Sequence, residues 1–478
     1  MESEEEELQL NNNVNRAALD FDTAAVCSVT LSVRGVYMCL KCGKTLAGLG
    51  TSSPAYLHSL ERAHHLFVQV GSGDGAIYAL PQGSRISAAS ASKLDDVIDE
   101  ARISCGLGLK EAHVNAICAR SLSSKEASPA VKRWDGERHA HGVMVLDVLH
   151  TGNYFNCVVL ALVSVPEVRN LLLRYRVSSN GFSSINTAEH EQDRQVLQAL
   201  AVLVQKMWLV NPLKTHRSPA ELANAVSRAS GKRFAPVGFA VASDFLCWLL
   251  AVLDRTIATD EPQAQHREPE ERRAAKRSRP LPASCMSQWF RGVLLCDEQR
   301  TDSSIQPAKA TNHQIPFWML SVDMMDTQDV DQASVHLSDL LRKYNGKTRS
   351  VRFTRLSTGE KTEVPCTFSL LRSPRFLVIH VNRLLKTAFG YSMRTTHVSF
   401  PLHNLQLLEL SSASPVMYGL RSIISHRGES VKTGSYVVHI LHEPTELWYN
   451  VSGPVPFRVL PELVSMEQAH ILLYERCA

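Results

Sequence analysis

The spacing of apolar residues changes along the chain, on either side of a charged, proline-rich stretch at residues 256–283. Before that stretch, apolar residues recur every three or four positions in "FNCVVLALVSVPEVRNLLLRY", "HEQDRQVLQALAVLVQKMWLV" and "VASDFLCWLLAVLDR", which predicts helices with a buried face. After it, short alternating segments such as "TEVPCTFSLL", "RFLVIHVNRL" and "SYVVHILH" predict β-strands. Helices followed by strands indicate an α+β domain.

The chain is expected to form two or three folded units, because 478 residues exceed one ordinary core. Residues 1–18 are acidic and polar and predict a disordered tail. Residues 19–122 are rich in Cys, His and Gly and end in a predicted helix, "SKLDDVIDEARI". A polar link at 123–141 leads into the second unit at 142–478, and residues 256–283 are expected to form a disordered basic insertion within it.

Composition restricts the function classes only loosely. The net charge of +4 is too small to indicate nucleic acid or membrane binding by itself, and no apolar run reaches membrane-span length. Eleven mostly isolated cysteines do not suggest a disulfide framework, so a reducing compartment is expected. The run "EERRAAKRSRP" is either a solvated loop or a contact for RNA phosphates or an import receptor. Its bases are Arg272, Arg273, Lys276, Arg277 and Arg279.

A Cys-x-x-Cys pair, Cys39 and Cys42, precedes three histidines at positions 58, 64 and 65. Two thiolates on a tight turn and two imidazoles from a following helix meet the tetrahedral preference of zinc. A reduced pair with surface histidines is the alternative. A redox pair is less favoured, because Gly43 leads into a loop and not into the helix of a thioredoxin-type site.

The segment "CSVTLS…YMCLKCGKTLAGLG…AYLHS…HHLF…IYALP" resembles the zinc finger of ubiquitin-specific proteases over about residues 18–86. The resemblance implies one zinc ion, held by Cys39, Cys42, His58 and His64. Family members that capture the carboxyl end of ubiquitin carry an arginine where this chain has Leu49. Since no guanidinium is available there for a carboxylate, ubiquitin-tail binding by this finger is not expected.

The second unit resembles the papain-like body of the same family over about residues 142–478, which implies a helical thumb with β-rich palm and fingers. Aligning Tyr154, Asn156 and Leu162 with the family's cysteine box places Asn153 at the nucleophile. Asparagine cannot form a thioester, so covalent catalysis would be closed. Val148 falls where the family has an oxyanion-stabilising asparagine, and it has no donor to offer.

The family's histidine box resembles "HRGESVKTGSYVVHI", and its catalytic histidine falls on Ser435. The orienting acid follows a tryptophan-containing segment, here "LWYNVSG", and falls on Ser452. With the thiolate, the base and the acid all missing, the resemblance implies a pseudoenzyme. The alternative nucleophile is Cys157, one helical turn further on, with His426 or His439 as a base.

Several ordered segments, including "DFLCWLLAVL" and "LLRKYNGKT", resemble the inactive, tri-snRNP-associated branch of the family. This resemblance implies a nuclear, non-catalytic splicing factor that acts as a scaffold for tri-snRNP proteins, with snRNA as a further candidate partner and no membrane. Two alternatives remain open: a ubiquitin-binding adaptor without protease activity, and an atypical deubiquitinase.

Overall fold

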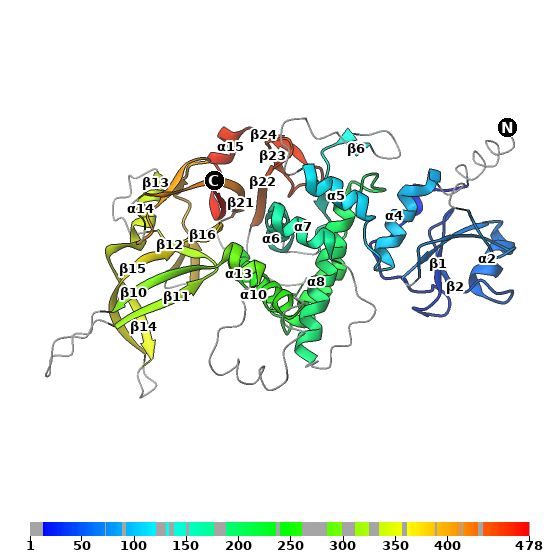
Figure 1. Ribbon diagram of the computed structural model, residues 1–478, viewed down its shortest axis with the longest axis horizontal. Helices are drawn as coiled ribbons and strands as arrows, with labels where there is room; N and C mark the ends of the chain where they lie inside the picture. Colours follow the sequence, from blue (N-terminus) through cyan, green and yellow to red (C-terminus); the bar gives the residue numbers. More distant parts are fainter. Residues whose placement is uncertain are drawn as a thin grey trace.

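The structure is a computed structural model of the 478-residue chain. It describes residues 13–71, 73–87, 92–120, 131–132, 138–149, 153–175, 188–235, 240–260, 284–298, 311–324, 334–355, 361–387, 390–410, 412, 414–428 and 434–477. The described part of the chain forms a small unit at one end, which carries the N-terminus, and a larger body of helices and sheets (Figure 1).

The small unit is a five-stranded sheet with helices packed against it. The sheet has the order β2-β1-β3-β4-β5, and each neighbouring pair is antiparallel. Its apolar core lies between the sheet and α4. The elements are η1 (Arg16–Ala18), β1 (Val36–Cys39), β2 (Thr45–Ala47), α2 (Pro54–Arg62), β3 (Leu66–Val70), β4 (Ile77–Ala79), β5 (Ser84–Arg85), η2 (Ser92–Leu94) and α4 (Asp95–Ser104).

A layer of helices lies between the small unit and the large sheets (Figure 1). The predicted helical segments coincide with α6 to α10, and a proline divides the first of them at Pro166, where α7 begins. Two pairs of two-residue strands accompany these helices. The elements are α5 (Glu111–Arg120), β6 (Val131–Lys132), β7 (Arg138–His139), β8 (Val145–Leu146), α6 (Tyr154–Val163), α7 (Pro166–Arg174), α8 (Ala188–Met207), β9 (His216–Arg217), α9 (Ala220–Ala229), α10 (Ala242–Asp260) and α13 (Cys285–Phe290).

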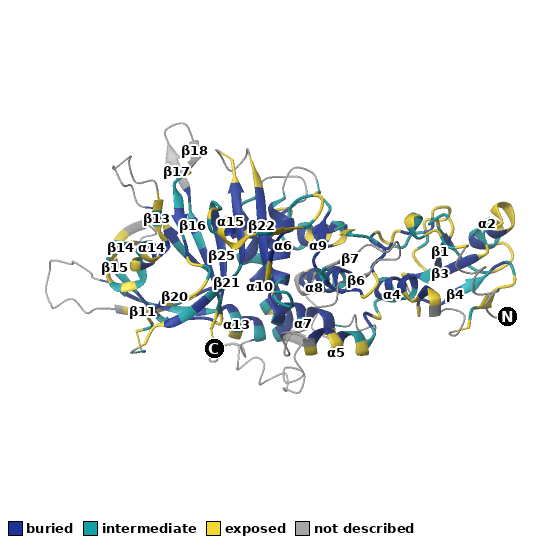
Figure 2. Ribbon diagram, turned by 90° about the horizontal axis from the view of Figure 1, so that it is seen from above, coloured by how far each residue is buried: buried dark blue, intermediate teal, exposed yellow. Residues whose placement is uncertain are grey.

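Helix α6 is the centre of the body, because all ten of its residues are buried. It contacts α7, α10, β21 and β22, so its apolar surface is covered on every side (Figure 2). No single described helix is long and apolar enough to cross a membrane. Helices α6 and α7 pass that test only as a pair bent by 89°.

The main sheet has the order β12-β16-β25-β21-β22-β23-β24, and β20 also pairs with β21. One face packs on the helices around α6, and the other covers a second core. The last strand in sequence, β25, lies between β16 and β21. The strands are β12 (Leu320–Asp323), β16 (Phe376–Asn382), β20 (Leu405–Leu407), β21 (Val416–Arg427), β22 (Ser435–His442), β23 (Leu447–Asn450), β24 (Phe457–Val459) and β25 (Ala469–Arg476).

A four-stranded antiparallel sheet, β11-β10-β15-β14, extends from the body. Two further strand pairs and short helices complete the described part of the chain. These elements are β10 (Gly292–Glu298), β11 (Thr311–Phe317), β13 (Ser334–His336), α14 (Leu337–Leu341), η3 (Arg342–Tyr344), β14 (Asn345–Arg355), β15 (Lys361–Arg372), β17 (Leu384–Thr387), β18 (Gly390–Met393), β19 (His397–Ser399) and α15 (Pro461–Ser465).

Some predicted segment boundaries differ from the structure. Residues 16–18, assigned to the disordered tail, form η1, and Arg16 Nε donates to Asp96 Oδ2 at 2.6 Å. Helix α10 continues to Asp260, so it includes the first residues of the predicted insertion, while residues 1–12 and 261–283 lie outside the described part. Helix α5, placed with the finger by sequence, packs against α7 in the core of the body.

Four buried charges join the two units. Asp22 and Glu100 come from the finger, and Lys206 and Arg217 come from the body. Arg217 donates to both oxygens of Glu100 at 3.2 and 2.5 Å and lies 3.5 Å from Asp22 Oδ1. Lys206 Nζ lies 3.4 Å from the same Asp22 oxygen and donates to the carbonyl of Phe21.

Burial acts to lower the pKa of Arg217 and of Lys206, and the nearby carboxylates act to raise the two pKa values by unequal amounts. Desolvation alone would lower the pKa of Arg217, but Glu100 and Asp22 raise that pKa above its ordinary value. For Lys206, desolvation outweighs the attraction of Asp22 and Glu100, so its pKa is lowered. The two positive and two negative groups therefore depend on one another, and each stays buried because its partners are present.

Replacing Arg217 by methionine (Arg217→Met) leaves Glu100 buried without its guanidinium. We expect a loss of about 3–5 kcal/mol in the free energy of unfolding, measured by urea denaturation. The matched control is Lys214→Met, which removes a partly exposed pair with Asp20 at 2.8 Å and should lose less than about 1 kcal/mol. Equal losses in the two variants would contradict the structural role of the buried charges.

Candidate functional site

The ligand atoms of Cys39, Cys42, His58 and His64 converge at the outer end of the finger, all within 4.8 Å of one another. Cys39 Sγ lies 3.5 Å from His64 Nδ1, and Cys42 Sγ lies 3.4 Å from His58 Nε2. The two imidazole nitrogens are 3.1 Å apart. Tetrahedral zinc with Zn–S of about 2.3 Å and Zn–N of about 2.0 Å separates its ligand atoms by about 3.3–3.8 Å, so this donor set fits the ion.

Local backbone chemistry builds this cluster. Gly43 turns the chain after the cysteine pair with φ of +72°, and a Cβ there would lie 2.1 Å from the carbonyl oxygen of Ala18, so only glycine fits. Ser53 caps α2, which carries His58. The helix ends at Ala63 in the left-handed conformation, and this reversal brings in His64 from beyond the helix.

The protonation states of the cluster suit metal binding with proton release. Burial raises the pKa of the Cys39 thiol to about 11 in the metal-free chain, and zinc would have to displace that proton. Burial also lowers the pKa of His58 and His64, so both imidazoles are neutral and free to coordinate near neutral pH.

Neighbouring residues of the finger have other partners. His65 Nδ1 bonds to the carbonyl oxygen of Leu80 at 2.9 Å, which leaves His58 and His64 as the two imidazoles of the cluster. Cys27 is fully buried, and its sulfur accepts backbone N–H bonds from Thr30 and Ala47. Leu49 packs on the second apolar cluster of the finger, beside the zinc ligands.

In the body, Asn153 joins α6 to β22. It occupies the N-cap of α6, but its side chain makes no capping bond. Instead, its Oδ1 accepts the N–H of Tyr436 at 2.7 Å, and its Nδ2 donates to the carbonyl oxygen of the same residue. Strand β23 pairs with residues 439–442 of β22, and the Val451 N–H donates to the carbonyl oxygen of Val438 at 3.3 Å. Tyr436 lies two residues before Val438, so the Asn153 amide bonds to the backbone of β22 just beyond the point where β23 ends.

The other positions that sequence assigns to catalysis take separate places. Ser435 is exposed and adjoins Tyr436, so it lies next to the Asn153 contact. Ser452 donates its N–H and its hydroxyl to Asn450 Oδ1, at 3.0 and 2.8 Å. Val148 is an exposed side chain. None of these three residues, nor Asn153, carries a thiol, an imidazole or a carboxylate. That the four correspond to catalytic positions stays a prediction.

The alternative machinery is buried. Cys157 is 1% exposed, and burial raises the pKa of its thiol far above the ordinary value, which opposes thiolate formation. His426 and His439 are also buried, with their pKa values lowered by desolvation. A solvent-borne substrate has no access to Cys157, so the structure gives no support to a nucleophile there. The basic residues 272–279 lie outside the described residues.

Two family models match the chain. The model described as "Ubiquitin carboxyl-terminal hydrolase" matches residues 148–474, and the "Zn-finger in ubiquitin-hydrolases and other protein" matches residues 26–91. The chain belongs to the ubiquitin carboxyl-terminal hydrolase family. In the vocabulary of this family, the helical layer is the thumb, the main sheet is the palm and the four-stranded sheet forms the fingers. The family match and the observed helices and sheets confirm the predicted α+β fold. The finger match likewise supports zinc as its cofactor.

Similar curated proteins cover nearly the whole chain. Human ubiquitin carboxyl-terminal hydrolase 39 is 26% identical over 97% of this chain and 79% of its own length. The probable mRNA-splicing protein ubp10 of Schizosaccharomyces pombe is 24% identical over 97% of this chain and 88% of its own. The pre-mRNA-splicing factor SAD1 of Saccharomyces cerevisiae is 21% identical over 100% and 95%.

Solved structures agree on the fold. The crystal structure of an essential yeast splicing factor aligns with a TM-score of 0.66 at 20% identity, covering 98% of this chain and 100% of that one. A SAGA deubiquitinating module bound to monoubiquitin aligns with a TM-score of 0.53 at 16% identity, covering 100% and 95%. The two-unit architecture thus occurs both in a splicing factor and in a module that binds ubiquitin.

Cys42→Ser should remove the zinc ion and unfold the finger, because the ion supplies much of the folding free energy of small metal-binding units. We expect about one zinc per chain in the parent and far less in the variant, measured by elemental analysis after dialysis. Cys247→Ser replaces a half-buried thiol outside the cluster and should keep the ion. Equal zinc content in all three proteins would exclude this site.

Asn153→Ala should lower the free energy of unfolding by about 1–3 kcal/mol, because the backbone N–H and C=O of Tyr436 lose their partner. Asn153→Asp keeps the acceptor for the N–H but sets a carboxylate against the Tyr436 carbonyl oxygen, so it should be at least as destabilising. Thermal and urea unfolding measure both. If Asn153→Asp proves as stable as the parent, the two hydrogen bonds between Asn153 and Tyr436 do not account for the contribution of Asn153 to stability.

Proposed function

We propose that this protein is a non-catalytic, nuclear pre-mRNA splicing factor that acts as an interaction scaffold in the tri-snRNP before spliceosome activation. The observation that carries the proposal is similarity across nearly the whole chain, finger and body together, to proteins named as splicing factors. Its expected partners are tri-snRNP proteins, with snRNA as a further candidate.

The chemistry of the cleft supports a role without catalysis. An acyl-transfer site needs a nucleophile, a base and an orienting group within hydrogen-bond reach. At the positions that sequence assigns to them, the described residues offer an amide engaged with Tyr436 and two serine hydroxyls. We therefore infer that Asn153, Ser435 and Ser452 mark a catalytic site that has been lost.

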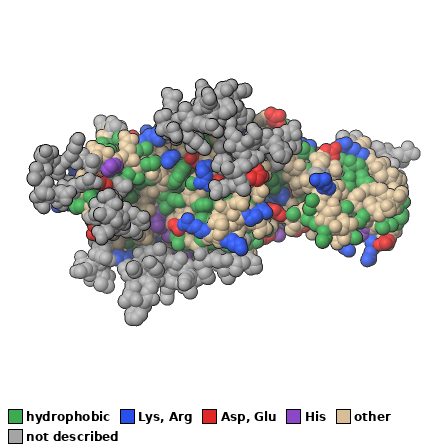
Figure 3. Space-filling view, turned by 90° about the horizontal axis from the view of Figure 1, so that it is seen from below, with side chains coloured by type: hydrophobic (Ala, Val, Ile, Leu, Met, Phe, Trp, Pro, Cys, Tyr) green, Lys and Arg blue, Asp and Glu red, His purple; other side chains and the backbone are tan. Residues whose placement is uncertain are grey.

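Rigid attachment of the finger supports a scaffold. The buried charges between the units, together with α4 packed on α8, fix the finger to the body as one surface. Lysine and arginine side chains of described residues are dispersed over the face shown in Figure 3, which favours protein contacts over a broad RNA-binding surface there. Phosphate contacts by residues 272–279 remain a prediction from sequence.

A ubiquitin-binding adaptor is the second candidate function, favoured by the presence of the zinc finger. It is weakened by Leu49, which provides no cation for the free carboxylate of ubiquitin. An atypical deubiquitinase is the third, and it would need a nucleophile other than the buried Cys157. Lack of reaction between the purified chain and a ubiquitin probe with a C-terminal electrophile would close that possibility.

Affinity purification of the full chain from nuclear extract, followed by RNA sequencing and protein identification, tests the proposal. We expect the tri-snRNP small nuclear RNAs and their proteins to be recovered. Arg217→Met, which disturbs the junction of finger and body, should reduce recovery, whereas Lys214→Met should not. Recovery of only proteasomal or ubiquitin-chain components would overturn the splicing role.

A further inference from the structure

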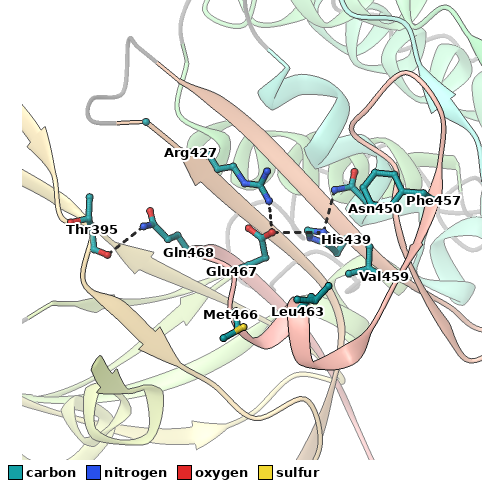
Figure 4. A pocket seen from close by; sticks show the side chains of 11 residues that line it. Thr395, Arg427, His439, Asn450, Phe457, Val459, Leu463, Met466, Glu467 and Gln468 are labelled. Atoms are coloured by element: carbon teal, nitrogen blue, oxygen red, sulfur yellow. Dashed lines mark hydrogen bonds and ion pairs between the residues drawn. The ribbon is translucent and has the colours of Figure 1, made fainter. Parts of the chain in front are cut away.

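A pocket of about 660 Å³ opens on the palm, lined by residues of β22, β23 and β24 and by residues of and after α15 (Figure 4). Its floor includes His439, Asn450 and Phe457, which stand side by side on adjacent strands β22, β23 and β24. One wall comes from α15 and the residues after it, including Leu463 and Met466. A volume of this size suits a few side chains of a bound molecule.

The rim of the pocket is unusually apolar for a surface. Five large apolar side chains within twelve residues are between 54% and 70% exposed. They are Val455, Phe457, Leu460, Leu463 and Met466, and of these Phe457, Leu463 and Met466 line the pocket. A run of exposed apolar residues next to a pocket marks an interaction surface, and its extent along the chain exceeds what a small ligand would cover.

The charges that line the pocket cancel. Arg427 Nη2 donates to Glu467 Oε1 at 2.5 Å, so the lining carries no net charge from this pair. Burial lowers the pKa of His439, which is therefore neutral near pH 7. A nucleic acid or a strongly charged peptide finds no unpaired charge to bind here. An uncharged apolar segment can instead contact the apolar side chains of the lining.

The polar side chains that line the pocket bond to one another. Ser452 N–H donates to Asn450 Oδ1 at 3.0 Å, which turns the Asn450 Nδ2 toward His439 Nε2 at 3.2 Å. His439 Nε2 also lies 3.9 Å from Glu467 Oε1, so the polar side chains of the lining are occupied by one another.

The sheet also ends at this place. Among the described strands, β24 is paired on one side only, by β23. An edge strand presents backbone N–H and C=O groups to which an extended peptide can pair, while alternate side chains of the peptide enter adjacent pockets. The apolar rim, the neutral pocket and the open edge therefore select the same kind of ligand.

We propose that the edge of β24 and the pocket beside α15 bind an extended, uncharged apolar segment of a partner protein, which pairs with β24 and places a large apolar side chain between Phe457, Leu463 and Met466. The site goes beyond the scaffold role proposed above and holds whether or not that partner is spliceosomal.

The test uses the purified full chain and a phage library of random twelve-residue peptides, so it involves no spliceosomal component. We expect selected peptides to carry large apolar residues at alternate positions without intervening charge. A fluorescein-labelled peptide of this kind should bind Met466→Asp and Leu463→Asp at least tenfold more weakly, and Met466→Leu within twofold of the parent. Hydrogen exchange at residues 457–459 should slow when it binds.

The matched control is Leu408→Asp, which alters a comparably exposed leucine outside the pocket and should bind the peptide as the parent does. The proposal is overturned if the selected peptides are charged, or if they bind Met466→Asp as tightly as the parent. It is also overturned if the chain forms a dimer that Met466→Asp dissociates, since a second copy would then occupy the pocket.

Discussion

Four buried charged side chains determine how this molecule is put together. Asp22 and Glu100 of the finger are buried, and Lys206 and Arg217 reach them from the other unit. Such a set adds little to stability compared with apolar contacts, but it is intolerant of misalignment, because a displaced partner leaves a bare charge behind. The arrangement therefore selects one orientation of the finger on the body.

Helix α4 joins the finger sheet to the body. One side of α4 packs on β3 of the finger sheet, and the helix also contacts α8 of the body. The zinc ligands lie at the opposite end of the finger, around β1 and α2 (Figure 1). The ion can thus stabilise the finger while the charges attach it, and the two tasks involve separate residues.

The sequence predicted what depends on local spacing. The helices around "FNCVVLALV", several palm strands and the four metal ligands all follow from periodicity or from a motif held within one segment. Strand β25 was not predicted, because its apolar run "AHILLYER" is buried on both faces and lacks alternation. Strand β10 was missed as well, although its burial does alternate.

Long-range pairing explains the remaining differences. Nothing in the residues near Arg217 indicates that its carboxylate partner lies 117 positions earlier. Likewise, the contact between Asn153 and Tyr436 spans 283 positions, and sequence could identify the asparagine without showing what it binds. The contacts that join His439, Asn450 and Ser452 also arise only through strand pairing.

The amide of Asn153 also limits which residues position 153 can accept. A cysteine there would lose both hydrogen bonds that the amide makes with the backbone of Tyr436. Position 153 is therefore constrained by the packing of the palm, independently of any chemistry that the position might perform.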